Sequence, residues 1–477
     1  MVKRKMIVFV VIIAALFLMV GCSSLFKSSF KWSSVNNPTG TNVLSTWARK
    51  YSTSLRDSAN FILPVNDGYI ISGLVEVPTG GVDGFAIKTD PNGQIIWQKS
   101  YGGEENDVLK FTIPTSDGGF VLLGETSSFA VNNGGIIAIK VNSQGDIQWA
   151  KAYDSQNQDF VNFVFPISDG ILIAGESGGK PFLAKISYQG ELNFWKIFVT
   201  GNQGMEGFRS VVNVNEGGQD YYILGGWGYF HPNEYGISDG FIVKVNASNN
   251  QIIWAKSIRK NDINDNNHST DVISFVVPVD DGYVLLGETG YQAYELSFMK
   301  IDLNGNSIWA KYFDVPLDPA NFIPTENGFL ILADDRESHL YIIKTQNNGQ
   351  IEDVRRFNSP ENNPVTAAFL NYSYFNGFVF VANFSPLPPS NIINNNILNN
   401  FVSGTEDFVV VKNDQNGFLD PGTLQYETIN NIISNDYQPI IEDVDLQISD
   451  GTINVNNVSN LITVGNPNFQ VDLLNPQ

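Results

Sequence analysis

Asn92-Gly93-Gln94-Ile95-Ile96-Trp97-Gln98-Lys99-Ser100-Tyr101 is a tight polar turn followed by an aromatic strand. Asn-Gly is typical of a hairpin turn because both residues can adopt positive φ. In a strand, alternate side chains share a face, so Trp97, Lys99 and Tyr101 lie on the same side. The stretch therefore predicts the last strand of an antiparallel unit whose packing face carries a tryptophan.

The same turn and strand recur along the chain. The column of Trp97 is also occupied by Trp149, Phe194, Trp254 and Trp309. Upstream, a Gly-containing turn precedes an apolar strand at Asp67, Asp117, Asp169, Glu216, Asp281, Asn327 and Asn376. Between the two turns a strand ends at Lys88, Lys140, Lys185, Lys244, Lys300, Lys344 and Lys412. Each copy therefore predicts four antiparallel strands in about 50 residues.

Sheets of this kind have two apolar faces, which radial stacking on a neighbour at each side buries. We therefore predict an all-β fold, a β-propeller of four-stranded antiparallel blades, with seven blades and eight as the alternative. The propeller spans residues 43–413, and its ring closes when the strand around Trp47 pairs with the strand that ends near Lys412. Residues 414–477 form a C-terminal extension with a β-hairpin or partial blade, which would supply the eighth.

The single cysteine, Cys22, follows a basic start and an apolar run from Met6 to Val20. This layout is typical of a secretory signal, and the run is short for a membrane span. Met19-Val20-Gly21-Cys22 resembles the lipobox of bacterial lipoproteins. The resemblance implies a signal peptide over 1–21, lipid of the palmitate type on Cys22, and a flexible tether over 22–42. It also implies export and anchoring to a bacterial membrane, with the body facing the periplasm or the cell exterior.

The repeats resemble those of exported bacterial β-propeller lipoproteins of unassigned function. Their Gly-x-x-x-Trp spacing, as from Gly93 to Trp97 and from Gly145 to Trp149, is similar to the tryptophan-docking repeats of quinoprotein dehydrogenases. It is also similar to the propeller lipoprotein that assists outer-membrane barrel assembly. The resemblance implies the fold and two different uses. The adjacent cysteine pair that many quinoproteins use is absent here, and no acidic pair matches their calcium site.

The overall charge and the variable loops restrict the function classes. A net charge of −21 repels phosphate backbones, so we expect no nucleic-acid partner. Loops between the second and third strands, and between blades, lie on one face, the loop-rich face. One of them predicts an aromatic ligand site for a sugar or peptide at Trp227, Tyr229, Phe230, His231 and Tyr235. The carboxylates of Asp262 and Asp265 are candidate Ca²⁺ ligands, so a Ca²⁺ site is an alternative.

Catalysis has little support, because the three histidines lie in separate loops and no nucleophile motif appears. We assign no catalytic residue and no cofactor apart from that Ca²⁺ alternative. The leading hypothesis is a lipid-anchored binding or scaffold module for a protein or glycan partner, with no convergent titratable groups of shifted pKa. The alternative is an envelope glycan hydrolase or lyase, which requires two carboxylates roughly 5 to 10 Å apart on the loop-rich face. A quinone-dependent oxidoreductase is the third hypothesis.

Overall fold

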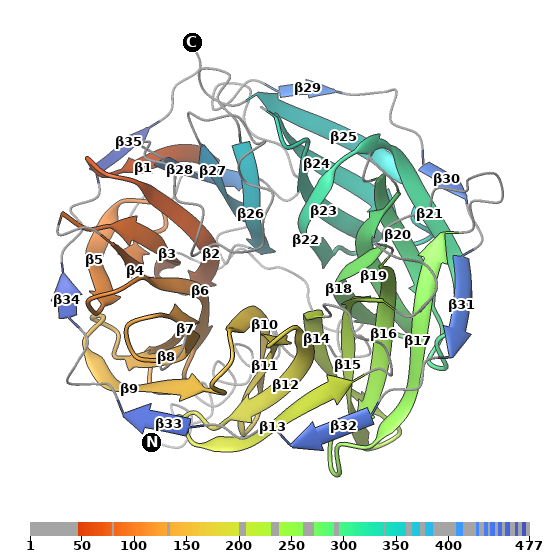
Figure 1. Cartoon of the computed structure of the whole chain (residues 1–477). Helices are drawn as coiled ribbons and strands as arrows, with labels where there is room; N and C mark the ends of the chain where they lie inside the picture. The colour runs from red at the N-terminus through yellow and green to blue at the C-terminus, as the bar shows by residue number, and fades with distance from the viewer. Residues whose placement is uncertain are drawn as a thin grey trace, which may run out of the picture.

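The computed structural model is a closed ring of seven blades (Figure 1), which confirms the predicted β-propeller and excludes the eight-blade alternative. It describes residues 46–413 except for 79–80, 131–133, 200–206, 230–237, 261–270, 291–294, 338, 359–364, 373–376 and 385–406. Beyond 413 it describes seven short strands between 426 and 473. In each blade the strands follow one another outward from the axis.

The strands of the first four blades follow the predicted repeat. Blade one is β2 (Asp57–Val65), β3 (Gly68–Glu76), β4 (Val82–Thr89) and β5 (Ile95–Gly102). Blade two is β6 (Asp107–Pro114), β7 (Phe120–Thr126), β8 (Gly135–Val141) and β9 (Ile147–Asp154). Blade three is β10 (Asp159–Ile167), β11 (Gly170–Ser177), β12 (Lys180–Ile186) and β13 (Leu192–Val199). Blade four is β14 (Gly207–Glu216), β15 (Gln219–Gly228), β16 (Asp239–Asn246) and β17 (Ile252–Lys260).

The last three blades complete the ring. Blade five is β18 (Val272–Val279), β19 (Gly282–Thr289), β20 (Glu295–Ile301) and β21 (Ser307–Pro316). Blade six is β22 (Asp318–Pro324), β23 (Gly328–Asp334), β24 (His339–Gln346) and β25 (Ile351–Asn358). Blade seven is β26 (Val365–Tyr372), β27 (Phe378–Phe384), β28 (Asp407–Asn413) and β1 (Trp47–Ser52). Trp47 pairs with Lys412, so the first strand closes the ring as predicted.

The tryptophan column joins neighbouring blades. The indole N–H of Trp97 in blade one donates to the carbonyl oxygen of Ser143 in blade two at 3.0 Å. Four residues later, the hydroxyl of Tyr101 donates to the carbonyl oxygen of Gly145 at 2.7 Å. Trp47, from blade seven, donates in the same way to Pro91 in blade one at 3.1 Å. The column therefore packs between blades, which is the role predicted from the repeat.

In blades one to five the lysine of the column pairs with an acidic residue of the same blade. Lys88 lies 2.8 Å from Asp67, and Lys185 lies 2.7 Å from Asp169, both of which stand in the turn between the first two strands. Lys140 and Asp117 make the equivalent pair in blade two at 2.9 Å. These lysines therefore tie the turn to the third strand and leave no free basic stripe on the described part of this face.

The C-terminal segment forms a belt around the ring. The belt strands are β29 (Tyr426–Thr428), β30 (Ser434–Asp436), β31 (Pro439–Asp443), β32 (Gln447–Asp450), β33 (Asn454–Asn457), β34 (Thr463–Gly465) and β35 (Gln470–Leu473). Each pairs antiparallel with the outermost strand of one blade, in the order six, five, four, three, two, one, seven. They lie at the periphery in Figure 1 and give every blade a fifth strand.

The belt corrects the prediction for residues 414–477. We expected a β-hairpin around Asp450-Gly451 or a partial blade. Instead β32 pairs with β13 and β33 pairs with β9, so the two strands lie on different blades. The physical reason is that the outer edges of the blades offer unpaired backbone groups, which a hairpin would leave exposed.

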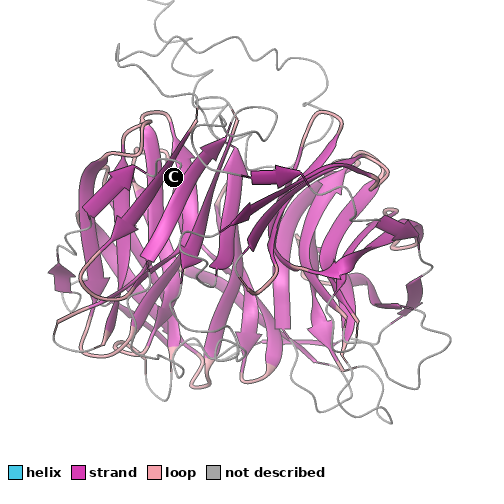
Figure 2. Ribbon diagram, turned by 90° about the horizontal axis from the view of Figure 1, so that it is seen from above, coloured by secondary structure: helices cyan, strands magenta, loops and turns pink. Residues whose placement is uncertain are grey.

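Phenylalanine side chains fill part of the axis. They follow the bulge of the innermost strand in five blades, at Phe61, Phe111, Phe163, Phe275 and Phe369. The rings of Phe61 and Phe369 lie 4.2 Å apart. Those of Phe163 and Phe275, two blades apart, lie 6.4 Å apart and so meet across the axis. Figure 2 shows the ring from its side, with the strands of the blades running between its two faces.

Candidate functional site

Two of the predicted site residues are described by the structure. Trp227 is the penultimate residue of β15 and Tyr229 follows the strand, and their rings make an edge-to-face contact at 5.8 Å. The remaining predicted residues, Phe230, His231, Tyr235, Asp262, Asp265 and Cys22, lie outside the described residues. Trp227 and Tyr229 therefore give the starting point for a site on the loop-rich face.

Trp227 belongs to a column that the sequence analysis missed. In blades two, six and seven one residue near the end of the second strand faces the innermost strand of the next blade, and blade one has Leu74 at this position. Glu125 accepts the backbone N–H of Val161 at 2.9 Å, and Asp334 accepts that of Ala367 at 2.9 Å. Asn383 accepts the N–H of Ala59 at 2.8 Å. Each of these N–H groups precedes a β-bulge, so the column caps the irregular point of the next blade.

Blades three, four and five depart from this pattern. The column holds Glu176, Trp227 and Glu288 there. An indole carries no acceptor for the cap, and the residue that Glu288 would cap is Pro319, which has no N–H. The pKa of Glu176 is raised by burial and lowered by the charge of Arg209 alone, without any backbone hydrogen bond. Glu176, Trp227 and Glu288, in three adjacent blades, therefore do not cap the bulge of the next blade.

Arg209 interacts with two of these residues, Glu176 and Glu288, through its charge. It occupies the bulge of β14, where the equivalent Asn60, Lys110 and Asn162 donate to a carbonyl oxygen of the next blade at 2.9, 3.2 and 2.8 Å. Among the described residues, Nε of Arg209 has no hydrogen-bond acceptor. Burial lowers its pKa, while the charges of Glu288, Glu176 and Asp318 raise it. A buried guanidinium nitrogen without an acceptor is costly and points to a missing partner.

Gly207 places Glu176 and Trp227 around one point. A Cβ atom built on Gly207 would lie 3.4 Å from Oε2 of Glu176 and 3.6 Å from Nε1 of Trp227. The carboxylate of blade three and the indole N–H of blade four therefore converge on the same small space.

Three carboxylates and one arginine continue this group into blades five and six. Arg336 binds Oδ2 of Asp318 through Nε at 3.0 Å and Oε2 of Glu288 through Nη2 at 3.2 Å. Burial and the charge of the neighbouring Asp318 together raise the pKa of Glu288 to about 8. Burial raises the pKa of Asp334 to about 7, again with a contribution from Asp318. We call the whole group the axial cluster, and it consists of Glu176, Arg209, Trp227, Glu288, Asp318, Asp334 and Arg336.

The axial cluster corrects one expectation. The binding hypothesis predicted no convergent titratable groups of shifted pKa on the loop-rich face, and that prediction is wrong. Glu288 and Asp318 both bind the guanidinium of Arg336, and burial together with the charge of Asp318 raises the pKa of Glu288. The carboxylates arise in different blades, which is why no local motif in the sequence could bring them together.

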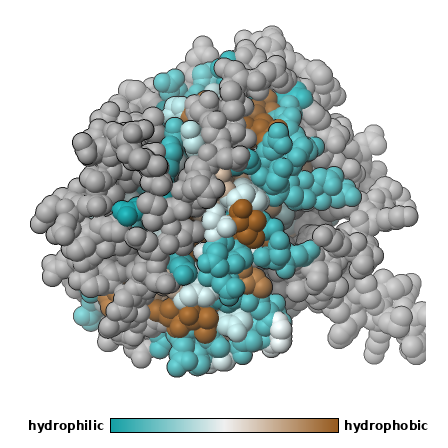
Figure 3. Space-filling model, turned by 90° about the vertical axis from the view of Figure 1, so that its right-hand side faces the viewer, coloured by the Kyte–Doolittle hydropathy of each residue, from teal (hydrophilic) through white to brown (hydrophobic). Residues whose placement is uncertain are grey.

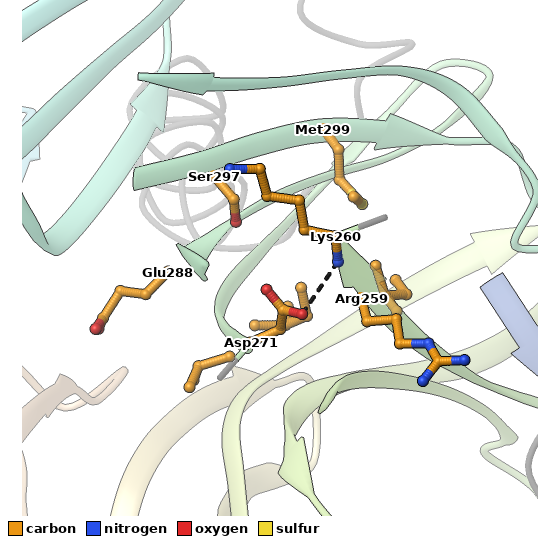
Figure 4. A pocket seen from close by; sticks show the side chains of 9 residues that line it. Arg259, Lys260, Asp271, Glu288, Ser297 and Met299 are labelled. Atoms are coloured by element: carbon orange, nitrogen blue, oxygen red, sulfur yellow. Dashed lines mark hydrogen bonds between the residues drawn. The ribbon is translucent and has the colours of Figure 1, made fainter. Parts of the chain in front are cut away.

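A small pocket lies next to the axial cluster, between blades four and five (Figure 4). Glu288 lines it together with Ile273, Met299 and the end of β17. Asp271 accepts the backbone N–H of Lys260 at 3.1 Å, and Nζ of Lys260 lies 2.6 Å from Glu295 and 4.0 Å from the ring of Tyr312. Lys260, Asp271 and Glu288, three polar residues that line this pocket, therefore already have partners.

Exposed apolar side chains form a second surface feature. Figure 3 shows brown groups among teal on one side of the ring. The exposed large hydrophobic residues of blades four and five are Ile253, Leu303 and Ile308, at 49, 36 and 49% exposure. They lie at the beginning of outer strands and in a turn, on the side away from the loop-rich face.

Two further observations concern metals and membranes. Among the described residues, no group of three or more His, Cys, Asp or Glu side chains is arranged to hold a metal ion. In the same part of the chain no helix has the length and apolarity that crossing a membrane requires.

No protein-family model and no curated relative matches the chain. Two solved structures are similar in fold, both described as candidate 6-phosphogluconolactonases. The one from Bacteroides fragilis has 14% identity and a TM-score of 0.32, and the match covers 65% of this chain and 94% of the other. The one from Bacteroides uniformis has 13% identity and a TM-score of 0.31, covering 65% and 95%. Similarity at this level carries no information on a ligand or reaction.

Proposed function

We propose that the chain is a binding module that recognises a partner through the axial cluster on its loop-rich face. The observation that carries this proposal is that Glu176, Trp227 and Glu288 occupy the capping column but do not cap a backbone N–H. In addition, the buried Nε of Arg209 has no acceptor among the described residues. In blades two, six and seven the same positions satisfy backbone groups, whereas blade one has the apolar Leu74 there. Polar groups that the fold leaves unmatched are available to a ligand.

The proposal includes a lipid anchor at Cys22. Its support is the sequence alone, namely the basic start, the apolar run and the small residue before the cysteine. An acyl anchor would tether the propeller to a bacterial membrane, facing the periplasm or the cell exterior. The test is labelling of cells with radioactive palmitate, where Cys22→Ser should abolish the label and release the chain from the membrane fraction.

The binding proposal is tested by capture of partners from a bacterial envelope extract. Residues 23–477 are immobilised and compared with the Trp227→Ala variant. We expect the wild type to retain a defined glycan or protein and the variant to lose it. Equal capture by both would remove the axial cluster as the binding site.

A second function, an envelope glycan hydrolase or lyase, is favoured by one observation. A carboxyl group with a pKa of about 8, such as Glu288, is protonated at neutral pH and can act as a general acid. The test is the release of reducing ends from envelope glycans. Glu288→Gln should lower the rate about 100-fold or more if this acid acts on substrate, and a wild type without activity rejects the candidate.

A further inference from the structure

We propose that the part of the axial cluster around Gly207 binds a neutral sugar ring of an oligosaccharide. This inference rests on the proposed binding function and names the class of ligand. The groups that define the site are the carboxylate of Glu176, the guanidinium of Arg209 and the indole of Trp227.

The hydrogen-bonding groups of the site match hydroxyl groups. Glu176 offers acceptors only, whereas Arg209 and Trp227 offer donors only. A hydroxyl group both donates and accepts, so neighbouring hydroxyls on one ring can satisfy all three residues together. Oε2 of Glu176 and Nε1 of Trp227 border the same space, because they lie 3.4 and 3.6 Å from the position that a Cβ atom on Gly207 would occupy.

The aromatic groups match the rest of a sugar ring. The rings of Trp227 and Tyr229 meet edge to face, at 5.8 Å and 80°, which leaves indole surface beside the polar groups. A pyranose has an apolar C–H face bordered by hydroxyls, so one such ring can contact the indole and the charged groups at once.

The charge of the cluster disfavours ionic ligands. Arg209 and Arg336 stand among four carboxylates, those of Glu176, Glu288, Asp318 and Asp334. Because Glu288 is protonated at neutral pH, the remaining charges of the cluster nearly balance, so an anion or a cation would lose its hydration without meeting an opposite net charge. A neutral ligand with many hydroxyls avoids this penalty.

The experiment uses the full chain in a polyoxyethylene detergent, which carries no sugar. It is probed on an array of neutral oligosaccharides, uronate-containing oligosaccharides and peptides. We expect binding to at least one neutral oligosaccharide, with an affinity at least tenfold lower in Glu176→Gln and Trp227→Ala, since each removes a hydrogen bond or an aromatic contact. Glu191→Gln, on the opposite face of blade three at the exposed turn, is the matched control and should bind like the wild type.

Gly207→Ala keeps the test valid if either of the other variants fails to fold. Its methyl group would make ordinary contacts of 3.4 and 3.6 Å and would occupy the shared space. We expect the variant to fold and to lose binding. Neutral-oligosaccharide binding that survives all three substitutions overturns the site. Capture of peptides or uronates alone overturns the ligand class and leaves the binding module intact, whereas a chain that captures nothing, from the array or from an envelope extract, refutes both proposals.

Discussion

Trp97 of blade one packs on Gly145 of blade two. The indole N–H of Trp97 bonds the neighbouring Ser143 carbonyl at 3.0 Å, and its ring would lie 3.0 Å from a Cβ on Gly145. Gly145 has a φ of +78°, which an L side chain rarely adopts. The close contact between the aromatic strand of one blade and the turn of the next therefore requires glycine in that turn.

Gly145→Ala should lower the free energy of unfolding by about 2–4 kcal/mol, from the positive φ and the contact with Trp97 together. Gly118→Ala is the control, because Gly118 has a φ of +81° and nothing within 4 Å of its Cβ position. Gly118→Ala should lower the free energy of unfolding only through the strained backbone, by about 1–2 kcal/mol. Urea unfolding measures both variants, and equal losses would show that the docking contact contributes nothing.

Removing the belt should leave the ring folded but less stable. The ring closes through the pairing of β1 with β28, in which the belt takes no part. A chain ending at Asn413 would expose the outer edge of all seven blades, and such edges invite pairing with other chains. We expect the β-sheet circular dichroism to persist, the melting temperature to fall and oligomers to appear in light scattering. A monomeric chain of unchanged stability would contradict this account.

Charges opposite one another should hold the belt in register. Asp436, Asp443 and Asp450 pair with Lys311, Lys256 and Lys196 in the ladders of blades five, four and three. Replacing the three aspartates by lysine would set like charges directly opposite, which destabilises a sheet. We expect limited proteolysis to cut the variant between 414 and 477 faster than the wild type. Replacement by asparagine, which introduces no repulsion, is the control and should have a smaller effect.

The sequence predicts the features that recur in each repeat, but it does not predict the contacts that residues of different blades form with one another. The Trp97 column, the Lys88 column and the closing strand at Trp47 follow from spacing alone, since each repeats or completes one unit. The belt was missed because its strands have only three to five residues and pair with distant edges. The axial cluster was missed because Arg209, Glu288 and Asp318 come from three blades. The sequence signal that could have revealed the column is the recurrence of a Gly-Glu pair near the end of the second strand, at Glu125, Glu176 and Glu288.

The raised pKa of Glu288 should make stability fall as the pH rises. A carboxyl group whose pKa is about 8 in the folded state, and near 4 when unfolded, binds more proton folded than unfolded between these values. The folded state therefore loses stability from about pH 5 to 8, by at most about 1.4 kcal/mol per pH unit for one proton. Glu288→Gln should flatten this dependence in urea unfolding. Glu191→Gln should keep the wild-type slope, and an unchanged slope in Glu288→Gln would contradict the assignment.

Pro319 is the reason why Glu288 does not cap the next blade, and restoring the N–H tests this. In blade three the equivalent N–H, that of Val161, donates to Glu125 at 2.9 Å. Pro319→Ala would offer the same donor to Glu288, and a hydrogen bond to the carboxylate favours its charged form. The pKa of Glu288 should then fall, and the loss of stability between pH 5 and 8 should become shallower than in the wild type.

The slope is the informative quantity for Pro319→Ala, since loss of proline also lowers stability by about 0.4–1 kcal/mol at every pH through the unfolded chain. The double variant Pro319→Ala with Glu288→Gln separates the two effects. If the new N–H acts through Glu288, the proline change should alter the slope in the wild-type background and leave it unchanged when glutamine stands at 288. An equal change of slope in both backgrounds would assign the titration to Asp334 instead, because this carboxyl group also has a raised pKa and faces Arg336.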